Sequence, residues 1–156
     1  MTRAAVRSTS RALAGGLALA GLLAGCAPAA RDRGVSPDAP LAARMKVADA
    51  GAGRAAFGQC AACHTINQGS GDRDGPNLYG VTRSAVGHNS ARFGYTAALQ
   101  SVGGTWTCAR LDRWLTNPAA FAPGTSMHFP GLRDGLTRAD VIAYLYATGG
   151  GKPDCR

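Results

Sequence analysis

The chain has 156 residues, which suits one domain of ordinary size, and a formal net charge of +8. Its basic residues are dispersed, without a basic run or interleaved aromatic residues, and this excludes nucleic-acid binding. Only two lysines and no glutamate occur, so most of the basicity reflects a general bias toward arginine.

The first 25 residues are predicted to be a signal peptide. Three arginines precede an apolar stretch over residues 12–24, which is too short to span a bilayer. The stretch ends in Leu22-Leu23-Ala24-Gly25-Cys26, which resembles a bacterial lipobox whose cysteine is lipidated. Two alternatives remain, a simple secretory signal cut near Ala27 or Ala30 and an uncleaved short anchor. We expect export to the periplasmic side of a bacterial membrane, with lipid on Cys26.

Residues 26–47 are expected to be a flexible tether between this anchor and a folded domain over residues 48–156. The tether contains three prolines and scattered charges but no sustained apolar period. Loss of the leader removes three arginines and leaves 14 basic residues against 9 acidic ones, a net charge of +5. A mildly positive surface of this kind suits an acidic protein partner.

Helical signals dominate the domain. Asp49 is a predicted N-cap, and Thr137-Arg138-Ala139-Asp140 resembles a capping box at the start of the last helix, which ends at Gly149. The Gly- and Pro-rich loops show no strand alternation, so the fold is expected to be all-α. Loops of this length persist when they wrap something rigid. The helices are predicted over about residues 49–60, 95–102, 108–117 and 137–148.

The stretch Cys60-Ala61-Ala62-Cys63-His64 carries the strongest chemical signal. C-x-x-C-H is the pattern by which a protein attaches a c-type haem covalently. Two thiols about one helical turn apart can add to two vinyl groups on one edge of a porphyrin, and the next histidine can reach the iron as an axial ligand. The alternative is that Cys60 and Cys63 form half of a zinc site completed by other cysteines or histidines.

Two cysteines, Cys108 and Cys155, remain after these assignments. An exported protein occupies an oxidising compartment, where two leftover cysteines usually form a disulfide. A bridge of this loop length contributes up to about 4 kcal/mol in the chain-entropy model. The alternative is two free thiols.

A series of short motifs follows the C-x-x-C-H stretch. The motifs are Gly75-Pro76-Asn77-Leu78-Tyr79-Gly80, Gly94-Tyr95-Thr96-Ala97-Ala98-Leu99, Trp106, Asn117-Pro118, Phe121, Pro123-Gly124-Thr125-Ser126-Met127 and Arg138-Ala139-Asp140-Val141-Ile142-Ala143-Tyr144-Leu145. In order and spacing they resemble the class I cytochromes c, particularly the small mitochondrial-like type, over about residues 53–149. The resemblance implies the cytochrome c fold, with about four helices and long loops around one covalent haem c, and a single-electron carrier rather than an enzyme.

The resemblance also implies the ligands of the iron. His64 would be the proximal ligand, and Pro76 would offer its carbonyl to the other ring nitrogen. Met127 would be the distal ligand, with His88 or His128 as alternatives. A thioether ligand raises the reduction potential, and full coordination leaves no open site for oxygen or peroxide.

Further residues match family positions. Tyr95 and Trp106 match residues that hydrogen-bond a haem propionate, and Arg83 would be its charge partner, although the loop after Gly80 is about one residue shorter than usual. A crossing of the first and last helices is implied at Gly53, Phe57, Tyr144 and Leu145.

The function expected from this resemblance is electron transfer in a respiratory-type chain. The partners would be a redox donor and acceptor, such as a quinol-oxidising complex, a terminal oxidase or a dehydrogenase. One alternative is a cytochrome subunit fixed to a dehydrogenase, reductase or oxidase complex. A less favoured one is a ligand-binding or peroxidatic haem protein in which Met127 dissociates.

Overall fold

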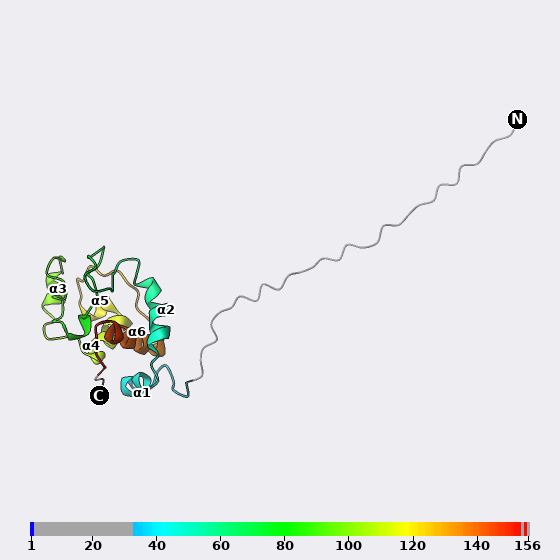
Figure 1. Cartoon of the computed structure of the whole chain (residues 1–156), viewed down its shortest axis with the longest axis horizontal. Coiled ribbons are helices and arrows are strands. Elements are labelled where there is room, and N and C mark those ends of the chain that lie inside the picture. Colours follow the sequence, from blue (N-terminus) through cyan, green and yellow to red (C-terminus); the bar gives the residue numbers. More distant parts are fainter. Residues whose placement is uncertain (2–32, 154, 156) are drawn as a thin grey trace. The chain divides into compact units, whose positions relative to one another are not determined.

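The computed structural model describes residue 1, residues 33–153 and residue 155. Within these residues no β-strand forms, and Ala85 and Thr105 make an isolated antiparallel bridge. The prediction of an all-α fold is therefore confirmed. The helices, shown in Figure 1, are α1 (Leu41–Lys46), α2 (Ala50–Ala56), η1 (Phe57–Gln59), η2 (Val81–Arg83), α3 (Ala97–Gln100), α4 (Cys108–Thr116), α5 (Pro118–Phe121) and α6 (Gly135–Thr148).

The helices α2 and α6 lie side by side (Figure 1), and they cross at Gly53. A Cβ atom at Gly53 would collide with the backbone carbonyl of Asp140, so glycine alone permits this approach. Beside it, Phe57 packs edge-on against Tyr144 with ring centroids 5.4 Å apart, and Leu145 is buried in the same core. The crossing expected at these residues is confirmed.

The predicted start of the last helix is wrong by two residues. Helix α6 begins at Gly135 because the Asp134 side chain accepts a hydrogen bond from the backbone N–H of Thr137 at 2.6 Å. Thr137 is therefore already inside the helix, and Asp140 is not part of a capping box. By contrast, Asp49 is the N-cap of α2, as predicted, and accepts from two backbone N–H groups.

The segment over residues 33–47, here called the N-terminal strap, is ordered, although we expected a flexible tether up to residue 47. Arg44 is only 5% exposed. Its guanidinium donates two hydrogen bonds to Asp112, at 2.9 and 3.0 Å, and one to the carbonyl of Gly135 at 2.8 Å. Arg33 donates to both carboxylate oxygens of Asp140, at 2.5 and 2.8 Å. These two pairs fix the strap against α4 and α6, which sequence periodicity could not predict.

Asp112 is shared by two arginines. Burial alone would raise the pKa of its carboxyl group, but hydrogen bonds from Arg44 and Arg138 outweigh burial and lower that pKa. The carboxylate is therefore held ionised between α1, α4 and α6.

The C-terminal segment is covalently attached to α4. Cys108 and Cys155 form a disulfide with their Cα atoms 5.2 Å apart. The signal peptide predicted over residues 1–25 and Cys26 lie outside the described residues. Among the residues that are described, no helix is both long and apolar enough to cross a membrane.

Candidate functional site

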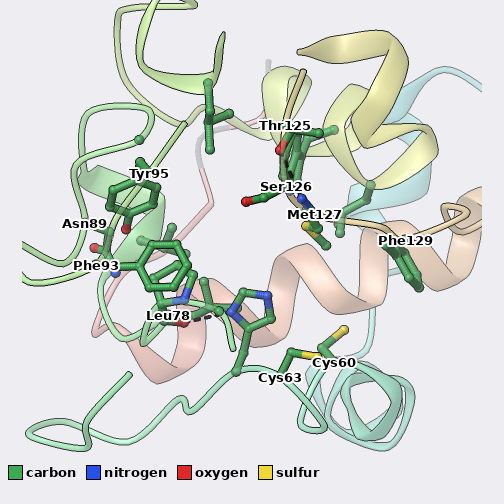
Figure 2. Close-up of a pocket in the computed structure, with 18 of the residues that line it drawn as sticks. Cys60, Cys63, Leu78, Asn89, Phe93, Tyr95, Thr125, Ser126, Met127 and Phe129 are labelled. Carbon is green, nitrogen blue, oxygen red and sulfur yellow. Dashed lines mark hydrogen bonds between the residues drawn. The ribbon is translucent and has the colours of Figure 1, made fainter. Parts of the chain in front are cut away.

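A cavity of about 470 Å³ lies beside the α2–α6 crossing. In Figure 2, Cys60 and Cys63 lie on one side of it, and the segment from Thr125 to Met127 enters from another. Most of the wall is apolar or aromatic, which suits a flat apolar ligand. The apolar wall consists of Phe57, Leu78, Val81, Leu99, Trp106, Leu111, Trp114, Leu115, Val141 and Leu145.

The stretch from Cys60 to His64 extends η1 by one helical turn. The backbone N–H groups of Cys63 and His64 both donate to the carbonyl of Cys60, at 3.1 and 2.9 Å. Both thiols are free and line the cavity, and burial raises the pKa of Cys60 to about 11. The local helix thus brings two thiols to the same side of the cavity.

The geometry gives no support to the zinc alternative. Cys108 and Cys155 are joined to each other, so they do not complete a site with Cys60 and Cys63. Over the part of the chain that the structure describes, no group of three or more His, Cys, Asp or Glu side chains is placed to hold a metal ion.

His64 has a defined tautomer. Its Nδ1 lies 2.7 Å from the carbonyl oxygen of Pro76, which can only accept, so Nδ1 carries the proton and Nε2 keeps a lone pair for a ligand. Burial lowers the pKa of His64, and the hydrogen bond to Pro76 opposes that shift. A Cβ atom at Gly75 would collide with the imidazole ring, so glycine lets this backbone lie against the ring.

Two residues that sequence reasoning missed hold the loop after Gly75. Asp72 accepts a hydrogen bond from the backbone N–H of Asn77 at 2.7 Å. Asn89, which lines the cavity (Figure 2), donates to the carbonyl of Asn77 at 2.6 Å and to that of Tyr79 at 3.4 Å. Their polar side chains in a Gly-rich loop are the available sequence signal, but their partners depend on the folded loop.

Met127 is presented by the loop between α5 and α6. Its backbone N–H donates to the side-chain oxygen of Thr125 at 3.3 Å, and the N–H of Leu132 donates to the carbonyl of Leu115 at 2.7 Å. Met127 lines the same cavity as His64 and lies in the segment labelled in Figure 2. The loop therefore brings a thioether and an imidazole to one cavity.

The two alternative distal ligands differ in position. His128 also lines the cavity, whereas His88 is exposed and does not line it. Of these two alternatives, the structure brings only His128 to the site.

Tyr95 and Trp106 both line the cavity. The Tyr95 hydroxyl accepts a hydrogen bond from the backbone N–H of Ser90 at 3.1 Å, and burial raises the pKa of Tyr95. Trp106 is buried and stacks on Phe121 with ring centroids 5.7 Å apart. Both residues belong to the site, and their role as propionate partners stays a prediction.

Arg83 does not line the cavity, and its expected role as the charge partner of a propionate stays a prediction. It ends the short helix η2, is exposed, and donates to the carbonyl of Gly150 at 3.3 Å. Gly80, in the left-handed conformation, begins this turn. In this position Arg83 contacts the C-terminal segment.

The residues around the cavity fit a c-type haem. Two free thiols stand one helical turn apart, one imidazole has its Nε2 available, and a thioether lies in the same cavity. The remaining wall is largely apolar, as a porphyrin face requires.

Comparison with known proteins agrees with this chemistry. A "Cytochrome c homolog" of Bradyrhizobium diazoefficiens is 44% identical over 106 residues, which are 68% of this chain and 58% of that protein. Cytochrome c of Cannabis sativa is 44% identical over 87 residues, 56% of this chain and 78% of that protein. No protein-family model matches the chain.

A solved structure is similar over much of the chain. Cytochrome cH from Methylobacterium extorquens superposes with a TM-score of 0.60 at 39% sequence identity. The match covers 64% of this chain and 98% of that one. It establishes the fold, and it leaves about a third of this chain without a counterpart there.

Proposed function

Since this chain belongs to the class I c-type cytochromes, electron carriers with covalently attached haem c, we propose that its haem is ligated by a histidine and a methionine. Cys60 and Cys63 hold the haem. His64 and Met127 ligate its iron. The observation that carries this proposal is the His64 ring, whose Nδ1 is committed to Pro76 while Met127 lines the same cavity.

A c-type haem supplies a one-electron couple at its iron. The chain's own residues determine how that couple behaves. His64 is held by Pro76, and Met127 is held by the loop over residues 123–132. Aromatic and aliphatic walls exclude water, which favours a carrier that changes little between its two oxidation states.

The test replaces Met127 with alanine. We expect a lower reduction potential and binding of carbon monoxide by the reduced protein, because a coordination position opens. The His128→Ala variant is the matched control, since its side chain lines the same cavity. Carbon monoxide binding by the wild-type protein would contradict the assignment and favour a ligand-binding protein. Carbon monoxide binding by His128→Ala but not by Met127→Ala would contradict it and favour His128 as the distal ligand.

The covalent attachment is tested separately. Haem should stay with the polypeptide through acidic-acetone extraction and denaturing electrophoresis, and the Cys60→Ala/Cys63→Ala variant should lose it. Retention of haem by that double variant would show that other groups attach it.

We propose further that the protein is exported and lipid-anchored through Cys26. Because residues 33–47 pack on the domain, only residues 27–32 separate that lipid from the folded part, a span of about 20 Å when fully extended. A redox partner near the membrane surface is therefore within reach. Mass spectrometry of the membrane fraction should find a diacylglyceryl group on Cys26, and a mature chain that begins after Cys26 would refute the anchor.

The partners are proposed to be a membrane-bound donor, such as a quinol-oxidising complex, and an acceptor, such as a terminal oxidase or a dehydrogenase, in a respiratory-type chain. A subunit fixed to one complex would need a large apolar docking patch. Over residues 33–153, no large apolar side chain is exposed. This observation favours a mobile carrier, and co-purification in a stable stoichiometric complex would favour the subunit.

A further inference from the structure

One peptide group lies between His64 and a carboxylate. The Pro76 carbonyl accepts from His64 Nδ1 at 2.7 Å, and the N–H of the same peptide, which belongs to Asn77, donates to Asp72 Oδ1 at 2.7 Å. The series therefore runs from carboxylate to peptide N–H, and from peptide carbonyl to imidazole N–H.

The Asp72 carboxylate is fixed on its other side as well. Its Oδ2 accepts from the Ser90 hydroxyl at 2.7 Å, and the Ser90 backbone N–H donates to the Tyr95 hydroxyl at 3.1 Å. The Asn77 N–H, followed by the Ser90 hydroxyl, lowers the pKa of Asp72. At neutral pH, the carboxylate that accepts from the Asn77 N–H is therefore ionised.

A charged acceptor makes a peptide hydrogen bond stronger and polarises the peptide. Polarisation by Asp72 increases the negative charge on the Pro76 oxygen, so that this oxygen withdraws the Nδ1 proton of His64 more strongly. The imidazole becomes a more basic ligand, and a more basic ligand favours the oxidised state of the metal that it binds.

We propose that Asp72 is a positioning residue that lowers the reduction potential of the site through the Pro76–Asn77 peptide. This inference rests on the proposed function, because it needs His64 as a ligand. It adds a charged residue of this chain to the set that determines the potential.

The test uses the holoprotein with Asp72→Asn. The amide has the same shape and can still accept from the Asn77 N–H, so the variant removes the charge and keeps the contact. Asp74→Asn is the matched control, because Asp74 is exposed and lines the same cavity. Both changes remove one negative charge, but only Asp72 is hydrogen-bonded to the peptide that holds His64.

Two measurements distinguish an effect of the carboxylate charge that is transmitted through the peptide from an effect that acts through space. Asp72→Asn should raise the reduction potential, and the shift should persist at about 1 M salt, where the screening length is about 3 Å. The shift caused by Asp74→Asn should largely disappear there. By nuclear magnetic resonance, the His64 Nδ1 proton should exchange several-fold faster in Asp72→Asn and at the wild-type rate in Asp74→Asn.

The proposal requires both results. An Asp72→Asn shift that salt abolishes, or an unchanged His64 Nδ1 proton, would overturn it. Failure of the proposed function would look different, since the wild-type protein itself would then lack the spectrum of histidine ligation. Asp72→Ala, which removes charge and acceptor together, should raise the potential at least as far as Asp72→Asn, and a smaller effect would also contradict the proposal.

Discussion

The two faces of α6 hold the molecule together in different ways. One face carries Val141 and Leu145 into the cavity, where apolar contacts and a few placed polar groups form the site. Another carries Asp140, which receives Arg33 and the backbone N–H of Asp49. We use the name cavity face for all residues that line or hold the cavity, and strap face for Arg33, Arg44 and Arg138 with their partners Asp112 and Asp140. The cavity face determines redox chemistry, whereas the strap face determines stability and the position of the N-terminal segment.

This difference matters because the faces obey different energetics. The free energy gained by burying apolar surface in the cavity is roughly proportional to the buried area, and such a surface tolerates substitutions that conserve volume. A buried ion pair is costly to assemble, and it is still more costly to leave half-paired. Variants of the two faces should therefore separate stability from redox behaviour.

The largest effect is expected from Asp112→Ala. It leaves the buried Arg44 and the neighbouring Arg138 without their carboxylate, which should lower the free energy of unfolding by about 3–5 kcal/mol. The visible spectrum of the folded protein should not change. Urea unfolding measures the loss, and the exposed Asp38→Ala is the control. Equal stabilities of the two variants would show that the strap face contributes little.

A smaller effect is expected from Arg33→Ala. Loss of its charged hydrogen bonds to Asp140 should cost about 2 kcal/mol. The strap should then open locally, so trypsin should cut after Arg44 and Lys46 faster than in the wild-type protein. The reduction potential should stay the same. Exposed Arg54→Ala is the matched control, and the same cleavage rate after Arg44 in both variants would refute the docking role.

Asn89→Ala tests the cavity face. It removes the donor to the carbonyls of Asn77 and Tyr79 and should cost about 1 kcal/mol. Because this loop holds the Pro76 carbonyl, the reduction potential should change although the stability loss is small. His88→Ala, in the exposed neighbouring position, should change neither quantity. A potential unaffected by Asn89→Ala would remove Asn89 from the set of residues that hold the site.

The smallest effect is expected when the pH is lowered from neutral to about pH 4, because the free energy of unfolding that the Asp112 ion pairs contribute should not change over this range. The folded-state pKa of Asp112 lies below its ordinary value, so its stabilisation is fully present above the unfolded-state pKa of about 3.9 and is lost only as the pH falls through the folded-state pKa. The stability difference between the wild-type protein and Asp112→Asn should therefore stay constant down to about pH 4 and shrink below it. A difference that disappears near pH 6 would contradict the ion-pair account.

The cavity face was largely predictable from the sequence, because its signals are local. Cys60, Cys63 and His64 are neighbours in one helical turn. The predicted N-cap Asp49 also acts on N–H groups within three residues. Short-range geometry of this kind follows directly from residue order. Met127, by contrast, is predicted from the resemblance to the class I cytochromes c and not from local geometry.

The strap face was not predictable, because its partners are distant along the chain. Arg33 and Asp140 are 107 residues apart, and Arg44 and Asp112 are 68 apart. Nothing in the Pro-containing segment over residues 33–47 marks those arginines as buried.

The central claim is that the cavity holds a haem iron between His64 and Met127. The most direct measurement is the electronic spectrum of the oxidised wild-type holoprotein at neutral pH. We predict the charge-transfer band of methionine sulfur bound to ferric iron, stable across neutral pH. Absence of that band, with a spectrum of two nitrogen ligands, would contradict the claim and identify His128 as the second ligand.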